Sequence, residues 1–451
     1  MSLHRARVAT FAAIATAVAL GMTGCAPGGS TATNDESTAA VSTDVASAGD
    51  VTIKLTDFWG SAEGEWIDQS IAGFEKKYPN VTIDRTTEDW GQLNSTLNLQ
   101  LQDENGPDIA TANNGWQSLG TLAKGGLVLN LDSYADAYDW DTTVPTTIAR
   151  QNKFTKDFAT MGDGSWFSTP MARTSLIGLY YNADKLKELG LEVPTSLEDV
   201  EAAATAAKAA GEVPFEYGSL DGSTSVLLGV QALLADKDKL NDYIYDDPSV
   251  KASDVGMTEA VETVKKWADA GWFPQDFEGI DYQTAVADFV GGQGLFRWEY
   301  TGSLGLSAEQ QAHFGYVQLP QQGADTAVGV GAAPGAMVIS SKSKNPDVAA
   351  AFLDYLMSPE TGQVAADLGL VPALSPDVKV PADSLSLTGE SAGAATLDTD
   401  DGYVPYFDWS SPTMLDTISQ NIQLVYAGKM TAEEFTAAVD ADRDAFLASQ
   451  G

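Results

Sequence analysis

Tryptophan side chains stand next to small polar, amide and acidic residues at two places where a predicted strand ends. The stretch Trp59–Glu63 (WGSAE) follows a predicted strand at 51–55, and Asn113-Asn114-Gly115-Trp116 follows another at 107–111. An aromatic ring offers an apolar face, while amides and carboxylates offer hydrogen-bonding groups. The combination indicates a binding site that uses both, and packing in a core is the alternative for either tryptophan alone.

The sequence contains few residues that could bind a metal ion or act as a nucleophile. Histidine occurs only at positions 4 and 313 and cysteine only at position 25, so neither an HExxH motif nor a paired CxxC motif is present. The stretch 329–335 (GVGAAPG) lacks the lysine of a phosphate loop. The stretch 397–403 (LDTDDGY) departs from EF-hand spacing, so a solvated acidic loop is preferred to a calcium site. We expect no catalytic residue, no metal ion and no cofactor.

The charge balance bears on possible partners. The 451 residues include 63 Asp and Glu against 25 Lys and Arg, a net charge of -38. Such a chain repels phosphate backbones, which argues against nucleic-acid binding. A solvated acidic surface explains the charge without any special function.

The N-terminus has the pattern of an exported protein. Arg5 and Arg7 precede an apolar run, Val8 to Leu20, that is shorter than the roughly 20 residues of a transmembrane helix. The pattern predicts a secretory signal peptide over residues 1–24. Met22-Thr23-Gly24-Cys25 resembles the lipobox of bacterial lipoproteins, although leucine is commoner at its first position, and this resemblance implies lipidation of Cys25. The alternative is that Cys25 is a small buried hydrophobe.

Residues 25–50 are predicted to form a disordered linker after the lipidated cysteine. Residues 26–50 contain no aromatic residue, lysine or arginine, so they cannot bury enough apolar surface to fold. The folded region is therefore expected to begin at Val51.

The order of predicted elements indicates an α/β fold. Strands are predicted at 51–55, 81–84 and 107–111, and helices at 67–78 and 93–101. Such alternation favours a largely parallel sheet, and a chain of this length exceeds one hydrophobic core, so two lobes are expected. Thr195-Ser196-Leu197-Glu198 predicts a capping box. Residues 381–402, rich in Ser, Ala, Gly and Asp, are predicted to form a long surface loop.

Six segments in a characteristic order resemble the extracellular solute-binding proteins that deliver carbohydrates to ABC importers. They are FEKKYPNVTID (74–84), GPDIAT (106–111), LYYNADKLKELGLEVPTSLEDVEAAA (179–204), AVADFVGGQGLFRW (285–298), FGYVQLP (314–320) and SKNPDVAAAFLDYLMSPETGQ (343–363). Each segment alone is weakly specific, but together, behind a lipobox, they form a strong composite.

The resemblance implies a two-lobed, type II periplasmic-binding-protein-like fold. Each lobe would be a mainly parallel sheet flanked by helices, with the ligand in the cleft between them. The expected lobes are 51–171 plus 330–371 and 172–329 plus 372–451. The chain crossings are expected near Pro170 to Ser175, Val328 to Ala332 and Leu370 to Pro372.

Further candidates follow from the resemblance. Arg173 stands at the first crossing, where a salt-bridge role is the alternative; Asp221 lies in a loop that family members offer to the sugar; and Asp408-Trp409 matches a late aromatic position. In LFRWEYTGS (295–303), Glu299 keeps the acid of the family pattern. By strand alternation Trp298 and Tyr300 share one face, so that one or both supply an aromatic platform there; the alternative is that Trp298 is core and Tyr300 alone does so. The predicted ligand-binding residues are Trp59, Ser61, Glu63, Asn113, Asn114, Trp116, Arg173, Asp221, Trp298, Glu299, Tyr300, Ala332, Asp408 and Trp409.

The resemblance implies a non-catalytic, lipid-anchored receptor on the outer face of the cytoplasmic membrane. It would be a monomer that captures a carbohydrate, more specifically an oligosaccharide, and delivers it to the permease subunits of an ABC importer. A secreted glycoside hydrolase, which also places tryptophan beside carboxylates, and a peptide or polyamine receptor of the same fold are the alternatives.

Overall fold

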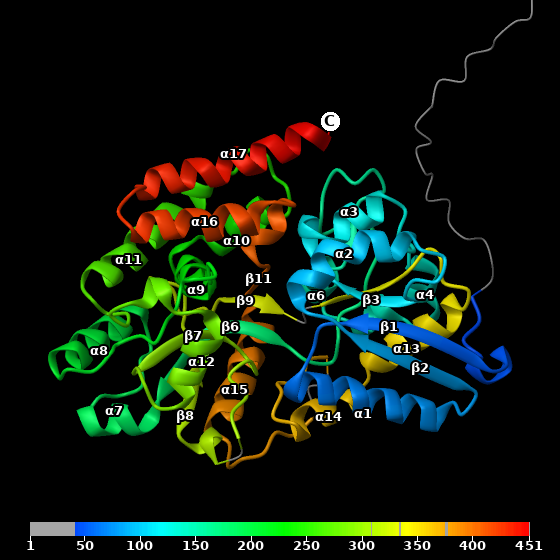
Figure 1. The fold of residues 1–451 in the computed structure, drawn as a ribbon, viewed down its shortest axis with the longest axis horizontal. Coiled ribbons are helices and arrows are strands. Elements are labelled where there is room, and N and C mark those ends of the chain that lie inside the picture. Colours follow the sequence, from blue (N-terminus) through cyan, green and yellow to red (C-terminus); the bar gives the residue numbers. More distant parts are fainter. Residues whose placement is uncertain (1–40, 308, 333–334, 375–377, 451) are drawn as a thin grey trace, which may run out of the picture. The chain divides into compact units, whose positions relative to one another are not determined.

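The computed structural model describes residues 41–450 except 308, 333–334 and 375–377, and these residues form one compact unit (Figure 1). The strands are β1 Val51–Asp57, β2 Val81–Thr87, β3 Ile109–Ala112, β4 Lys153–Phe154, β5 Ser165–Trp166, β6 Ser175–Asn182, β7 Phe296–Tyr300, β8 Phe314–Val317, β9 Gly329–Ala332, β10 Ala336–Ile339 and β11 Tyr403–Val404.

The α-helices are α1 Ser61–Lys77, α2 Trp90–Gln102, α3 Leu119–Lys124, α4 Asp132–Ala137, α5 Trp140–Thr143, α6 Thr146–Arg150, α7 Ala183–Leu189, α8 Leu197–Ala209, α9 Ser225–Leu234, α10 Lys237–Ile244, α11 Met257–Asp269, α12 Tyr282–Val290, α13 Pro346–Leu356, α14 Pro359–Asp367, α15 Leu385–Asp400, α16 Met414–Tyr426 and α17 Ala432–Gln450. The 3-10 helices are η1 Val45–Ala48, η2 Gly115–Gln117, η3 Ala252–Val255, η4 Phe277–Gly279, η5 Gln310–Ala312 and η6 Phe407–Ser410.

The first sheet has the strand order β10-β3-β1-β2. β1 pairs in parallel with β2 and β3, and β10 joins β3 antiparallel. Val51, Ile53 and Leu55 are buried and the positions between them are exposed, which confirms the predicted alternation. Because β1 and β3 are parallel, the segments that follow them, from Phe58 and from Asn113, meet at one edge of the sheet.

Helices cover both faces of the first sheet. In Figure 1, α1 and α14 lie below it and α2 and α3 lie above. Phe74 of α1 packs against Phe352 and Tyr355 of α13, with ring centroids 5.2 and 5.5 Å apart. Trp66 of α1 donates its indole N–H to the backbone oxygen of Thr361 in α14 (2.8 Å). These contacts join helices nearly 300 residues apart in the sequence.

The second sheet differs from the mainly parallel arrangement expected. Its order is β11-β9-β6-β7, with β8 also paired to β6. β6 is antiparallel to β7, β8 and β9, and only the short β11 is parallel to its neighbour β9. The chain returns from β7 to β8 without a crossover helix between them, so the two strands can both run against β6.

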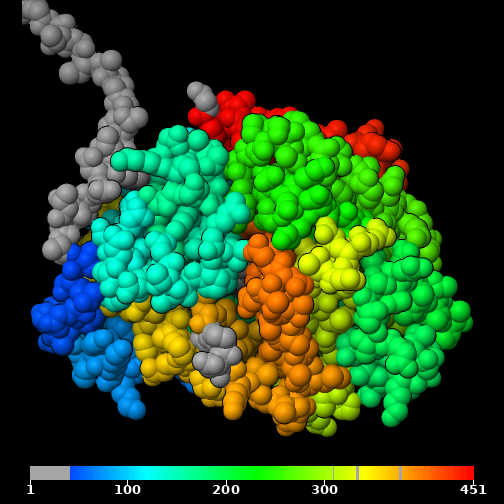
Figure 2. Space-filling view, turned by 180° about the vertical axis from the view of Figure 1, so that it is seen from behind, coloured from blue at the N-terminus to red at the C-terminus, as the bar shows by residue number. Residues whose placement is uncertain are grey.

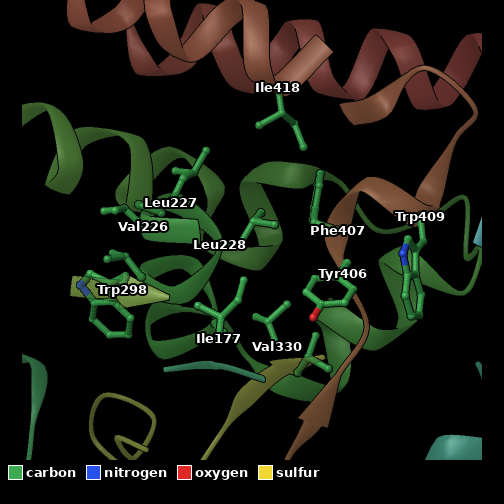
Figure 3. Close-up of a cluster of buried hydrophobic side chains, with 14 of the residues drawn as sticks. Ile177, Val226, Leu227, Leu228, Trp298, Val330, Tyr406, Phe407, Trp409 and Ile418 are labelled. Atoms are coloured by element: carbon green, nitrogen blue, oxygen red, sulfur yellow. The ribbon is translucent and has the colours of Figure 1, made fainter. Parts of the chain in front are cut away.

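The core of the second sheet lies beneath α9. Val226, Leu227 and Leu228 of this helix belong to one hydrophobic cluster with Ile177 of β6 and Val330 of β9 (Figure 3). The helices α11, α16 and α17 pack outside α9. On the opposite face, α15 packs against β8, and in the view from behind the orange segment containing α15 lies between the two halves of the chain (Figure 2).

Residues 381–402 are largely helical, so the predicted surface loop is wrong. Ser384 caps α15 by accepting a hydrogen bond from the backbone N–H of Leu387 (3.1 Å). Leu387, Glu390, Ala394 and Leu397 recur at helical spacing and are buried. The small residues of this segment allow close packing on the sheet: a Cβ on Gly389 would lie 2.4 Å from the backbone oxygen of Tyr316.

The capping box predicted at Thr195–Glu198 lies one residue further along. Ser196 accepts from the backbone N–H of Asp199 (3.1 Å), and Asp199 accepts from the N–H and hydroxyl of Thr195. Glu198 therefore has no part in the cap, because the helix begins at Leu197.

The chain passes between the two sheets more than once. Thr169 still bridges Met337 of the first sheet, whereas β6 begins at Ser175 in the second. Arg173 forms a bridge with Pro372, so the first and third crossings lie side by side. β9 keeps residues 330–332 in the second sheet, although the expected boundary assigned them to the first lobe. The second passage therefore begins after Ala332.

The folded region begins before Val51. Residues 45–48 form η1, in which Val45 is buried, and the side-chain amide of Asn80 donates to the backbone oxygens of Val45 and Gly49 (2.9 Å each). The last part of the expected linker is thus ordered, because the side chain of Val45 packs in the hydrophobic cluster that surrounds the first sheet. The predicted signal peptide, Cys25 and the linker up to residue 40 lie outside the described residues.

Candidate functional site

A cavity of about 620 Å³ lies where the segments after β1 and β3 face the second sheet. It is lined by Phe58, Trp59, Gly60, Ser61, Ala62, Glu63, Trp90, Ala112, Asn113, Arg173, Ser175, Thr224, Tyr282, Gln283, Tyr300, Gly302, Ser303, Gly305, Gly335, Tyr406, Asp408, Trp409 and Leu415. The volume falls within the range of about 300–1,000 Å³ that small-molecule sites occupy.

Eight of the fourteen predicted residues line this cavity. They are Trp59, Ser61, Glu63, Asn113, Arg173, Tyr300, Asp408 and Trp409. Among the other predicted residues whose side chains are described, Asn114, Trp116, Asp221, Trp298 and Glu299 do not. The structure therefore brings together residues from five separate stretches of sequence.

The turn after β1 positions the aromatic residues of the first wall. Asp57 accepts from the backbone N–H of Trp59 (3.0 Å), and Arg85 binds Asp57 through two nitrogens (2.6 and 2.8 Å) and donates to the backbone oxygen of Trp59 (2.7 Å). Phe58 packs against Trp59 and Trp90, with centroids 4.7 and 4.5 Å apart. A buried charge pair thus fixes the turn that presents these rings.

Arg173 brings a cation to the same wall. Its guanidinium pairs with Glu63 (2.9 Å) and lies 5.3 Å from the ring centroid of Trp59. Its Nε is buried and has no hydrogen-bond partner among the described residues. The salt bridge expected as an alternative is therefore present, and the arginine also lines the cavity with one donor unused.

Three further aromatic rings form the second wall. Tyr406 lies between Tyr300 and Trp409, with centroid distances of 5.9 and 5.3 Å, and its hydroxyl donates to the backbone oxygen of Ser175 (3.1 Å). Trp409 packs directly against Gly115. A Cβ atom at position 115 would lie only 2.3 Å from the Cβ of Trp409, so this contact needs glycine. Asp408 also lines the cavity, and burial raises its pKa to about 6.

Glu299 and Asp221 both accept hydrogen bonds from Tyr282, which lines the cavity. Its hydroxyl donates to Glu299 Oε1 (3.0 Å), and its backbone N–H donates to Asp221 Oδ2 (2.9 Å). Glu299 is fully buried and is paired through its other oxygen with Arg297 (2.6 Å). Both predicted acids therefore hold a cavity-lining tyrosine instead of lining the cavity themselves.

Trp116 and Asn114 lie in the core behind the cavity, not at its surface. The indole N–H of Trp116 donates to Asp246 (2.8 Å), and its ring packs against Phe154 and Phe446. The side-chain amide of Asn114 donates to the backbone oxygen of Gln151 (3.0 Å). η2 turns these side chains inward directly after β3, which the sequence did not indicate.

Trp298 lies in the core, which agrees with the interpretation that Tyr300 alone faces the ligand site. Its ring would meet a Cβ on Gly229 of α9 at 2.7 Å, whereas Tyr300 lines the cavity. Ala332 ends β9, where its backbone pairs with Ser175, and its side chain is outside the described set. Of the rings missed from the sequence, Tyr406 adjoins the predicted Asp408 and Trp409, but Tyr282 begins a helix and carried no distinguishing signal.

Features of catalysis are separate from the cavity. A GxSxG sequence, GESAG at 389–393, lies inside α15 and not at the strand-to-helix turn of a nucleophile elbow. His313 is exposed and bonds Asp184 (2.7 Å). Among the described residues, no group of three His, Cys, Asp or Glu side chains could hold a metal ion. None of the helices described is long and apolar enough to span a membrane.

Comparison with known proteins identifies the family. The model of the bacterial extracellular solute-binding protein family matches residues 59–363. The chain belongs to this family. Its solute-binding relatives include the multiple sugar-binding protein of Streptococcus mutans serotype c, to which it is 27% identical over 209 residues, 45% of this chain and 50% of that protein. The chain thus matches about half the length of this curated relative.

Solved structures share the fold of this solute-binding protein. A chitin oligosaccharide binding protein superposes with a TM-score of 0.71 at 19% identity, covering 88% of this chain and 99% of that one. RafE of Streptococcus pneumoniae, solved in complex with raffinose, has a TM-score of 0.66 at 20% identity and covers 88% and 100%. The fold is the two-lobed α/β arrangement of type II periplasmic binding proteins.

Proposed function

We propose that this chain is the substrate-binding subunit of an ABC importer and that it captures a carbohydrate, specifically an oligosaccharide. The observation that carries the proposal is the composition of the cavity: aromatic rings on both walls, with Arg173, Asn113, Gln283, Glu63 and Asp408 between them.

The cavity chemistry fits a sugar better than a peptide or a polyamine. The C–H faces of sugar rings lie on aromatic side chains, and their hydroxyl groups need planar or charged hydrogen-bond partners. The guanidinium group of Arg173 lines the cavity and is a planar donor that suits a hydroxyl oxygen. The relatives support the same ligand class, because they include proteins named for sugars, chitin oligosaccharides and raffinose.

Capture would involve closure of two lobes around the ligand. The first lobe comprises 51–171 and the region from β10 to about 371, and the second comprises the rest of the folded chain. Contacts to rings on both walls stabilise the closed state relative to the open one. The permease would then recognise the closed pair. Lipidation of Cys25 would hold this monomeric, exported receptor at the outer face of the cytoplasmic membrane.

A binding role also explains the two carboxylates of the cavity. A glycoside hydrolase needs one free acid and a second carboxylate about 5 to 9.5 Å away. Glu63 is neutralised by Arg173 instead of being free to act as an acid or nucleophile. Non-catalytic capture is therefore the simpler account of the site.

A thermal-shift screen tests the proposal. The panel comprises raffinose and the chitin, xylan and malto-oligosaccharides of two to six units, with spermidine and a tripeptide as comparisons. A ligand that binds only the folded state raises the unfolding temperature, so at least one sugar should do so in a saturable way. Stabilisation by spermidine or peptide alone, or release of reducing ends during incubation, would contradict it.

A further inference from the structure

A second, smaller cavity adjoins the main one. It has a volume of about 160 Å³, and Ser61, Ala62, Gly302 and Gly305 line both cavities. Its other walls come from Tyr180 of β6, from Leu304, Leu306 and Gln311, from residues 368–370, and from Ser386 and Glu390 of α15. This side chamber therefore continues the cleft behind the 302–305 turn, between the N-terminus of α1 and the third crossing.

The chamber contains a buried carboxyl group that is incompletely satisfied. Glu390 of α15 is 4% exposed, and its Oε1 accepts from the hydroxyl of Tyr180 (2.7 Å). Its Oε2 is buried and has no hydrogen-bond partner among the described residues. A buried carboxyl oxygen without a hydrogen-bond partner loses the solvation it had in water and gains nothing in return, so it destabilises the fold. A fold that merely needed to fill this space could have used an apolar residue.

The chamber has polar side chains among apolar ones, which include Leu304, Leu306, Leu368 and Leu370. Ser386 also lines the chamber from α15, and Gln311 lines it from the opposite side. At roughly 30 Å³ per water molecule, 160 Å³ holds about five waters or one sugar ring. Burial raises the pKa of Glu390 to about 7, so both protonation states occur near neutrality. A hydroxyl group can donate to the carboxylate and accept from the carboxylic acid, which an ammonium group cannot do.

The 302–305 turn is built to pass close to the third crossing. Gly302 and Gly305 have positive φ (78° and 58°), and a Cβ on Gly302 would lie 3.1 Å from Leu370. The backbone N–H of Gly302 donates to the hydroxyl of Tyr180 (3.3 Å), which in turn bonds Glu390. The turn that separates the two cavities is thus tied to the carboxyl group of the chamber.

We propose that this side chamber is an accessory subsite that takes one further hydroxyl-bearing unit of the oligosaccharide, with Glu390 as its hydrogen-bonding partner. This proposal rests on the proposed function and deepens it, because it makes the side chamber the feature that determines the preference for a longer sugar. Ligands confined to the main cavity bind without the chamber, and ligands with one more unit gain affinity from it.

Calorimetry with the sugars of the panel tests this subsite in two variants. Glu390→Gln keeps the shape of the side chain but alters its hydrogen bonding, and Leu306→Trp reduces the chamber volume from the opposite wall. In the wild-type protein, affinity should increase with one added unit. Each variant should weaken binding of the longer sugar at least about fivefold and leave the shorter sugar within about twofold. Unfolding temperatures check that both variants fold.

The outcomes separate this inference from the proposed function. If no sugar binds the wild-type protein, the proposed function fails and the subsite with it. If sugars bind but affinity does not rise with the added unit, or if both variants affect long and short sugars equally, the subsite alone is wrong. Loss confined to the longer sugar in both variants supports it.

Discussion

Single residues at this site act either on the ligand cavity or on the side chains that line it. Glu299 and Asp221 belong to the second group, because both bond Tyr282. Asp57 has the same role on the opposite wall, where it holds the backbone of Trp59. Of the four acids predicted from the sequence, Glu63 and Asp408 therefore line the cavity, whereas Glu299 and Asp221 hold Tyr282, which lines it.

The substitution Glu299→Gln tests whether Glu299 supports the residues that line the cavity. The substitution leaves Arg297, which is 2% exposed, without its charge partner. Removing one partner of a buried pair typically costs about 3–5 kcal/mol, and we expect a loss of this order in the free energy of unfolding from denaturant titration. The exposed pair Lys342–Glu104 provides a matched control, since Glu104→Gln should change the unfolding midpoint little. Equal effects of the two substitutions would contradict a supporting role for Glu299.

At the scale of elements, helix starts are set by local side-chain caps. Asp89 accepts from the backbone N–H groups of Gly91 and Gln92 (2.9 and 3.2 Å) at the start of α2, directly before Trp90 of the cavity. Asp236 caps α10 in the same way. These caps fix where a helix begins and hence where the adjoining loop residues lie.

Asp89→Ala should destabilise the protein by about 1 kcal/mol, because two N–H groups of α2 lose their acceptor. Thermal unfolding measures the effect. Asp89→Asn retains a capping oxygen and should remain close to wild type. If Asn and Ala were equally destabilising, charge rather than capping would be responsible.

Much of the fold could be predicted from hydrophobic periodicity, and less of the site. The strands and helices up to β3 follow their apolar spacing. The helical segment at 381–402 was missed, because its small residues resemble a loop and only tertiary packing on β8 shows their role. Trp116 and Trp409 look alike in sequence, yet η2 turns the first into the core and η6 presents the second to the cavity.

At the scale of the whole molecule, several buried acids make stability depend on pH. Burial raises the pKa of Asp246 and Asp408 to about 6 and that of Glu216 and Glu390 to about 7. Their values in the unfolded chain are near 4. Between about pH 4 and 7 the folded state therefore binds more protons than the unfolded state, and stability increases as the pH falls.

We expect the unfolding temperature to be higher at pH 5.5 than at pH 7.5. Partial relief of the net charge of -38 acts in the same direction. Glu390→Gln should reduce the difference between the two pH values by removing one of the titrating groups. A steady fall in unfolding temperature from pH 7.5 to 5.5 would contradict this account.

Membrane attachment through Cys25 is a separate prediction for the whole protein. In cells, the wild-type protein should fractionate with membranes, whereas Cys25→Ala should appear in the medium. The substitution lies outside the binding region, so the released protein should bind sugar with unchanged affinity. Retention of Cys25→Ala in the membrane fraction would contradict the lipid anchor.

Binding of sugar by the aromatic cavity is the central claim, and isothermal titration calorimetry tests it most directly. The measurement compares wild type, Trp409→Ala and Trp272→Ala, with a panel sugar that stabilises the wild-type protein. Trp409 lines the cavity, while Trp272 is buried in a different aromatic cluster. Loss of the ring should weaken binding by about tenfold or more in Trp409→Ala, and Trp272→Ala, once shown to be folded, should bind as wild type does. Equal affinity in all three proteins, or the absence of binding heat with every sugar, would contradict the claim.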